Sequence, residues 1–200
     1  MQTYSHFLIT AVVNKKLKDK GVAVASKALL LGSVAPDIPL ILISIGFIAY
    51  TQFFAPAGTS DLFMESYDRL YFTNPWWIAA HNMFHSPLLL LLYGAVGYWG
   101  MKRGNGWGKA LFWFAIGCGL HSMIDILTHV NDGPVVFFPL NWTYRFRSSI
   151  SYWDPEYGGA IFAPLEHLLD LGIIIYLARD WRKRKLLRNQ AQANLETESV

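Results

Sequence analysis

The run His121-Ser122-Met123-Ile124-Asp125-Ile126-Leu127-Thr128-His129 decides the fold, because it places three ligand-type side chains in steps of four within an apolar stretch. Residues four apart share one face of an α-helix, so His121, Asp125 and His129 would form a single stripe. Each unpaired ionisable group costs on the order of several kcal/mol in hydrocarbon, so the stripe should face polar partners, water or an ion. This pattern predicts a metal site inside a helical membrane bundle.

Two other segments repeat this pattern. His81 and His85 are four residues apart, and Glu166, His167 and Asp170 lie within one helical turn. Buried ionisable groups in three apolar runs need partners at the same time, which favours a shared site. The alternative is a buried polar network that fixes helix register and holds no ion.

The composition indicates a membrane protein of one domain. Of 200 residues, 53% are hydrophobic and 16% charged, and the mean hydropathy is +0.26. The net charge is +3, and the basic residues gather in segments 15–27, 102–109 and 179–188. These clusters alternate with apolar runs and form no continuous patch, which argues against nucleic-acid binding. The single Cys118 excludes a disulfide within the chain.

Four apolar runs approach the ~20 residues that cross a bilayer, namely 28–50, 76–100, 107–130 and 160–178. Trp76, Trp107 and Trp181 stand at their ends, where aromatic rings favour the lipid–water interface. The predicted fold is therefore all-α, a polytopic membrane bundle with about four transmembrane spans. Residues 1–180 form one membrane-embedded metal-binding domain, and 181–200 form a basic and then disordered cytoplasmic tail.

The first predicted span contains Pro36 and Pro39, which predict a broken helix. Asp37 could cap a new helix after the break. A broken helix at membrane depth is tolerated where it lines a cavity. If the two halves form a re-entrant pair, the side of the membrane that Asp37 faces changes, so this point stays open.

The basic clusters predict an orientation. All three fall on the cytoplasmic side, as do both termini, while segment 131–159 lies outside. On this scheme the three ligand stripes converge near the outer leaflet.

The ligand types indicate the chemistry. Imidazole and carboxylate together suit a divalent metal, zinc first and also manganese or iron. Glu166 and Asp170 would then act as general base or support the ligands. His129 and His167 could hydrogen-bond to the ligands. The candidate ligands suffice for one ion and nearly for two, and they are His6, Asp37, His81, His85, His121 and Asp125.

The external segment 131–159 combines Arg145 and Arg147 with Trp142, Tyr152 and Trp153. Arginine suits bidentate phosphate binding, and aromatic rings suit an interface. The segment could therefore recognise the phosphate of a lipid or lipid-linked substrate. The alternative is a loop that lies on anionic lipid and has no role in binding substrate.

Four segments carry a family resemblance, in this order: Ser5-His6, Ala35-Pro36-Asp37-Ile38, His81-Asn82-Met83-Phe84-His85-Ser86 and His121 to Thr128. Over residues 3–175 the chain resembles the YdjM-like inner-membrane family of metal-dependent hydrolases, which is distantly similar to zinc-dependent phospholipase C. The resemblance implies a location in the bacterial inner membrane and the six candidate ligands named above. The family usually has a second acidic residue after the Pro-Asp pair, where this chain has Pro39, so the number of ions stays open.

Two functions follow from these observations. The first is a membrane-bound metal-dependent hydrolase of a phosphoester in a lipid or lipid-linked molecule. The second is a non-catalytic membrane protein with a structural or sensing metal site. Ion conduction is disfavoured because segments 88–96 and 110–119 are almost wholly apolar, whereas a conduction path needs polar groups through the full depth.

Overall fold

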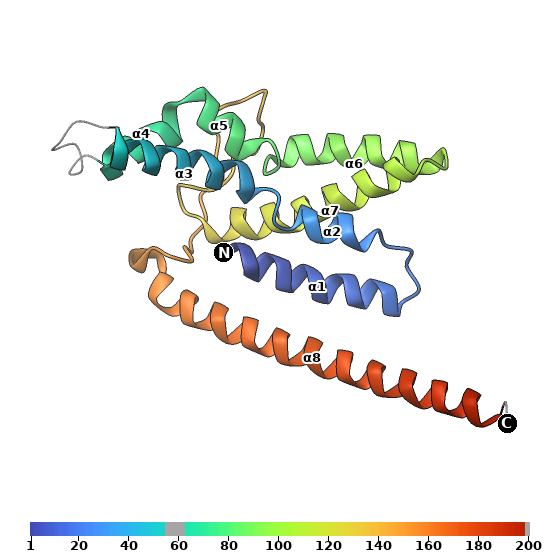
Figure 1. The fold of residues 1–200 in the computed structure, drawn as a ribbon. Helices are drawn as coiled ribbons and strands as arrows, with labels where there is room; N and C mark the ends of the chain where they lie inside the picture. Colours follow the sequence, from blue (N-terminus) through green and yellow to red (C-terminus); the bar gives the residue numbers. More distant parts are fainter. Residues whose placement is uncertain (55–62, 199–200) are drawn as a thin grey trace.

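The computed structural model describes residues 1–54 and 63–198, which fold into helices joined by turns and one long loop (Figure 1). The described part contains no strand, only an isolated pairing of Val135 with Arg145. This confirms the all-α class. The helices are α1 (Thr3–Asp19), α2 (Ser26–Gly32), α3 (Asp37–Phe53), α4 (Phe63–Thr73), α5 (Pro75–Asn82), α6 (Pro87–Lys102), α7 (Gly106–Thr128) and α8 (Gly159–Glu198), with a 3-10 turn at Pro155–Tyr157.

The predicted break lies between α2 and α3, whose axes differ by 45°. α2 ends at Gly32 and α3 begins at Asp37. Pro39 lies in the first turn of α3, where a missing N–H leaves no intrahelical bond unmade. Asp37 is the first residue of α3 and makes no capping bond, contrary to the predicted cap. Its carboxylate instead accepts a hydrogen bond from the Thr3 hydroxyl.

The prediction of about four spans needs correction. In the described residues, α7 and α8 are long and apolar enough to cross a membrane, and the bent pair α2–α3 makes a third candidate. The predicted span 76–100 is divided into α5 and α6, because Pro87 disfavours a helical conformation at Ser86. α6 alone has 16 residues, fewer than the ~20 that cross the hydrocarbon core.

Close packing around α7 positions part of the site. α6 and α7 form an antiparallel hairpin, and α2 packs against the middle of α7 (Figure 1). A Cβ on Gly117 would collide with the Leu29 carbonyl oxygen, so only glycine permits this backbone-to-backbone contact. The approach brings the end of α2 to α7, where the Ser33 carbonyl reaches the imidazole of His121.

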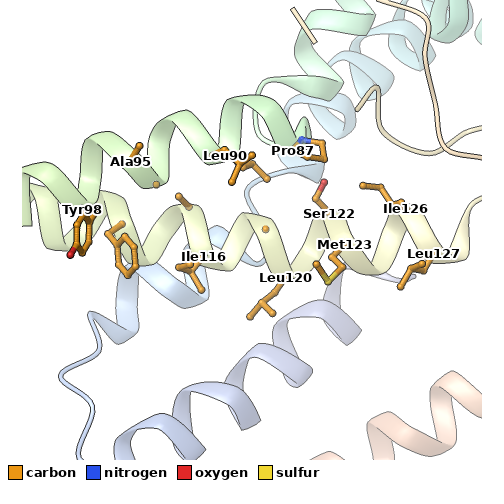
Figure 2. Close-up of a pocket in the computed structure, with 15 residues that line it drawn as sticks. Pro87, Leu90, Ala95, Tyr98, Ile116, Leu120, Ser122, Met123, Ile126 and Leu127 are labelled. Carbon is orange, nitrogen blue, oxygen red and sulfur yellow. The ribbon is translucent and has the colours of Figure 1, made fainter. Parts of the chain in front are cut away.

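An apolar groove of about 890 Å³ lies between α6 and α7 (Figure 2). Its walls are hydrocarbon side chains such as Leu90, Ile116, Leu120 and Met123. No carboxylate or imidazole lines it, so it offers no metal ligand. This face suits contact with the hydrocarbon of a bilayer.

α8 continues to Glu198, whereas the sequence analysis predicted a disordered tail. The segment 179–198 contains no glycine or proline and is rich in good helix formers, which explains the extension. Two ion pairs fix it beside the end of α1: Lys15 with Asp180 at 3.1 Å and Asp19 with Arg184 at 2.8 Å.

The two termini lie at different ends of the bundle. The Met1 amino nitrogen is 3.0 Å from Asp125, near the end of α7, whereas the chain leaves at the far end of α8 (Figure 1). That both termini face the cytoplasm stays a prediction. The three basic segments do share one end, formed by the end of α1, the α6–α7 turn and the second half of α8.

Candidate metal centre

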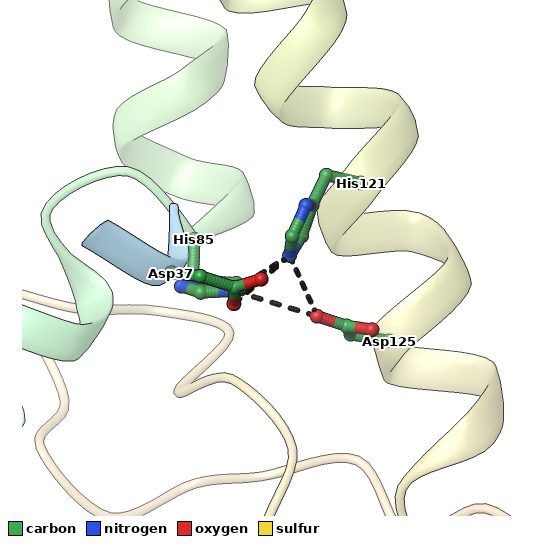
Figure 3. A group of neighbouring side chains, drawn as sticks. All are labelled: Asp37, His85, His121 and Asp125. Atoms are coloured by element: carbon green, nitrogen blue, oxygen red, sulfur yellow. Dashed lines mark hydrogen bonds and ion pairs between the residues drawn. The ribbon is translucent and has the colours of Figure 1, made fainter. Parts of the chain in front are cut away.

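Four side chains from three parts of the chain meet at one point (Figure 3). They are Asp37 at the start of α3, His85 in the α5–α6 turn, and His121 and Asp125 one turn apart on α7. One ligand atom from each lies within 4.8 Å of the others, and all but Asp37 are buried. The structure therefore joins residues that the sequence placed in three separate runs.

Backbone hydrogen bonds fix both imidazoles. His85 Nδ1 is 2.7 Å from the His81 carbonyl oxygen, and His121 Nδ1 is 2.8 Å from the Ser33 carbonyl oxygen. A carbonyl oxygen only accepts, so each Nδ1 carries a proton and donates it. In the neutral ring this leaves Nε2 with a free lone pair, and metal-binding histidines are commonly oriented in this way.

The distances within the cluster fit tetrahedral coordination. His85 Nε2 and His121 Nε2 are 3.2 Å apart, and His121 Nε2 is 2.9 Å from Asp125 Oδ2 and 3.4 Å from Asp37 Oδ1. His85 Nε2 is 3.4 Å from Asp125 Oδ2 and 3.7 Å from Asp37 Oδ1. A tetrahedral zinc site with ordinary bond lengths has ligand atoms roughly 3.3 Å apart. These four residues therefore fit a small divalent ion.

His6 adjoins the cluster through Asp125. Its Nε2 is 3.0 Å from Asp125 Oδ1, the carboxylate oxygen that faces away from the two other imidazoles. Its ring stacks on that of His121 with centroids 3.7 Å apart, and its buried Nδ1 has no hydrogen-bond partner. The structure thus places His6 next to the four clustered residues rather than among them.

His81, the remaining candidate ligand, does not join the four. Its ring stacks on that of His85 with centroids 4.4 Å apart, and its Nε2 is 3.2 Å from the Tyr71 hydroxyl. The Tyr71 hydroxyl donates to the carbonyl oxygen of Asp132 at 2.6 Å. Burial raises the pKa of Tyr71, so the phenol keeps the proton that it donates.

His129 continues the predicted ladder at the end of α7. Its Nδ1 is 2.9 Å from the Asp125 backbone carbonyl oxygen and 3.9 Å from Asp125 Oδ1. Burial lowers the pKa of His129. The side chain of His129 therefore hydrogen-bonds to the backbone at the end of α7 and does not join the four clustered residues.

The acidic residues of α8 contact α1. Glu166 accepts a hydrogen bond from the backbone nitrogen of Gln2 at 2.7 Å, and Asp170 accepts one from the Ser5 hydroxyl at 2.8 Å. Both carboxylates are buried. His167 is largely exposed, and its Nδ1 is 3.1 Å from the Tyr4 hydroxyl. The catalytic roles that the sequence suggested for Glu166 and Asp170 stay predictions.

The two loop arginines lie outside the cluster. Arg145 donates to the Gly133 carbonyl oxygen, and its guanidinium lies 5.0 Å from the centroid of the Tyr71 ring. Arg147 is exposed and donates to the Tyr157 hydroxyl at 3.3 Å. Arg145 thus fixes the long loop against α4, and phosphate binding by either arginine stays a prediction.

A cavity of about 480 Å³ opens onto the cluster at Asp37 and Asp125. The sequence analysis did not identify most of its polar lining, which comes from α4 and the long loop. Asp132 lies three residues after His129, so its position in the sequence could have indicated a place near the site. The sequence of α4 shows no comparable pattern. Burial and the carboxylates of Asp125 and Asp132 raise the pKa of Tyr152 in this wall to about 12. The lining also includes Asp68, Tyr71, His81, Trp153 and Asp154.

Comparison with known proteins identifies one family. The model of the YdjM inner membrane protein family matches residues 1–191. No curated protein and no solved structure matches the chain. The match covers almost the whole chain, including all four residues of the cluster.

Proposed function

We propose that this chain, which belongs to the YdjM inner membrane protein family, is a membrane-bound metal-dependent hydrolase. Its substrate would be a phosphoester in a lipid or lipid-linked molecule. Residues 1–180 would form one membrane-embedded metal-binding domain, with the rest of α8 projecting into the cytoplasm. Zinc is the preferred ion, and manganese and iron suit the same ligands.

One observation carries the proposal. Two imidazole nitrogens and two carboxylates converge, and both Nδ1 atoms face backbone carbonyl oxygens. With neutral rings the cluster contains acceptors alone, so these groups repel each other unless a cation lies between them. A divalent ion removes this repulsion and accounts for the tetrahedral spacing.

The chemistry proposed for the site uses the open side of the cluster. A divalent ion bound there would act as a Lewis acid and lower the pKa of water to roughly 7. Asp37 and Asp125 line the cavity, so a phosphoester there would lie next to the ligands. The backbone nitrogens of Met1 and Gln2 link Asp125 to Glu166, so the two carboxylates lie at most about 9 Å apart. We assign proton transfer to Glu166 and support of α1 to Asp170.

The position of the cavity supports a lipid substrate. It lies beside the start of α3 and the long loop, and that loop exposes Trp142, Phe146 and Trp153. Exposed aromatic rings of this kind favour the membrane interface. A substrate held in the bilayer by its acyl chains could present its head group there.

A test of the proposed function uses zinc-loaded protein in lipid nanodiscs that contain a panel of phospholipids and lipid-linked phosphates. We expect release of product from at least one substrate, at least 100-fold faster than after chelation, with recovery when zinc returns. Liquid chromatography with mass spectrometry measures the product. Metal-loaded protein that leaves the entire panel intact would favour a structural or sensing metal instead.

The proposed orientation has its own test. The basic end would face the cytoplasm and the long loop would face the opposite side. In a Cys118→Ser background, Asn105→Cys and Glu156→Cys place single thiols at exposed positions of opposite ends. A membrane-impermeant maleimide applied to intact cells should label the second thiol and leave the first unlabelled. Equal labelling of both thiols from outside would contradict the orientation.

A further inference from the structure

We propose that the 480 Å³ cavity beside the metal cluster binds a protonated primary amine carried by the substrate. This inference rests on the proposed function and adds one chemical group to the substrate. It places the ammonium group among Asp68, Asp132 and Asp154, next to a phosphoester held at the cluster. The charge of the cavity, its aromatic wall and one unpaired nitrogen favour such a ligand.

The cavity is strongly acidic. No lysine or arginine lines it, and five carboxylates do: Asp37, Asp68, Asp125, Asp132 and Asp154. Among the described residues, none of the five lies within 4.0 Å of a lysine or arginine nitrogen, although the Met1 amino group contacts Asp125. One divalent ion at the cluster would balance only part of this charge. A phosphate group alone would enter an unfavourable field, whereas a substrate that also carries a cation would not.

Aromatic side chains form part of the same wall. Tyr152 and Trp153 both line the cavity, and the Trp153 indole N–H donates to Asp132 Oδ2 at 2.9 Å. An ammonium group is attracted both to the face of an aromatic ring and to a carboxylate. Arg145 already lies over the rings of Tyr71 and Phe72, so Tyr152 and Trp153 are the rings that we assign to the ligand.

His81 indicates that the amine is primary. The Tyr71 hydroxyl gives its proton to the Asp132 carbonyl oxygen, so its oxygen accepts from His81 Nε2–H. His81 Nδ1 is then an acceptor, and it is buried without a hydrogen-bond partner in a side chain that lines the cavity. A primary ammonium group has three N–H donors for such acceptors, whereas a quaternary ammonium group has none.

A second metal ion is the rival occupant. Within residues 1–54 and 63–198, one group of ligand atoms lies mutually close enough for an ion, and it is the cluster already described. Asp132 and Asp154 each accept a hydrogen bond within the loop, from the Trp153 indole and from the Glu156 backbone. Asp68, Asp132 and Asp154 are therefore arranged around a space rather than around a point.

The test compares three small phosphates on zinc-loaded protein in detergent, by isothermal titration calorimetry. They are O-phosphoethanolamine, phosphocholine and n-propyl phosphate, the last of which replaces the ammonium group with a methyl group. We expect O-phosphoethanolamine to bind at least 10-fold more tightly than either of the others. Asp132→Asn should reduce this preference to less than 3-fold and leave the zinc content unchanged, because Asp132 lies outside the four-residue cluster.

Two further variants keep the test decisive. Asp68→Asn changes an exposed residue of α4 on another wall, so it should fold normally and also reduce the preference. Glu156→Gln makes the same chemical change in the loop at a residue that does not line the cavity, and it should keep the full preference. Ethylammonium chloride and ethanol, titrated into protein with and without zinc, test the amine site independently of metal and phosphate.

The outcomes separate the two proposals. Equal binding of all three phosphates by zinc-loaded protein would overturn the amine site and leave the hydrolase proposal standing. If the protein binds two equivalents of zinc and the Asp132→Asn variant loses the second, the cavity holds a second metal ion and the amine site is overturned. Protein that binds no zinc but prefers ethylammonium to ethanol would refute the metal-dependent function and support the amine site. Protein that neither binds zinc nor prefers ethylammonium to ethanol would refute both proposals.

Discussion

Asp125→Ala should lower the affinity for zinc by at least about 100-fold and destabilise the bundle by about 3 kcal/mol. Asp125 bridges the site, because one oxygen faces His121 and His85 and the other faces His6. Its loss would leave three buried imidazoles without their shared anion. Competition with a fluorescent zinc chelator measures the affinity, and thermal unfolding in detergent measures the stability.

Asp132→Ala is the matched control for this variant. Asp132 lies seven residues further along the chain and lines the cavity, but it is not one of the four clustered residues. Zinc affinity within about 3-fold of the parent protein is expected. Unchanged zinc affinity in Asp125→Ala would show that the four residues form a polar network without an ion.

Glu166→Gln should keep the metal and lower turnover by about 100-fold or more, the usual scale for loss of a general base. The amide oxygen can still accept the hydrogen bond from the Gln2 backbone nitrogen, so α1 should stay in place. The variant therefore removes the proton acceptor and keeps the position of α1. Initial rates on the best substrate of the panel, together with zinc content, measure both properties.

Asp170→Asn makes the equivalent change one turn further along α8 and retains an acceptor for the Ser5 hydroxyl. It should keep turnover within about 5-fold of the parent protein. Full turnover in Glu166→Gln would mean that Glu166 only holds α1. Equal losses in both variants would mean that the position of α1, rather than proton transfer, limits the rate.

The ladder on α7 was predictable because it depends on local periodicity alone. Steps of four place His121 and Asp125 on one face, and the structure has the expected helix from Gly106 to Thr128. The break before α3 was predictable for a similar reason, since two prolines in one apolar run are incompatible with a straight helix. The long helix that extends to Glu198 was missed because polar composition was weighed above helix propensity.

The membership of the cluster could not be derived from spacing. His81 and His85 share the four-residue spacing, yet the chain turns after Asn82 and only His85 meets His121. His6 reaches Asp125 because α1 packs against α7, a contact between residues about 120 positions apart. Such long-range contacts depend on the packing of whole helices, so a local pattern cannot specify them.

The lining of the cavity also depends on long-range contacts, so the sequence alone could not specify it. Asp68 on α4 and Asp154 in the long loop line the same cavity although 86 positions separate them. The sequence drew attention to the arginines of the loop, which suggested an anion site. In the structure Asp68, Asp132 and Asp154 line the cavity and Arg145 donates to the Gly133 carbonyl oxygen, while phosphate binding by the arginines stays a prediction.

The metal content of the purified protein shows whether the four clustered residues hold an ion. Protein purified in detergent from metal-replete cells, without an affinity tag that binds metals, can be analysed by inductively coupled plasma mass spectrometry. We predict about one equivalent of zinc per chain. Replacing both His85 and His121 with alanine should remove this zinc. Less than a tenth of an equivalent of any divalent transition metal would contradict the account.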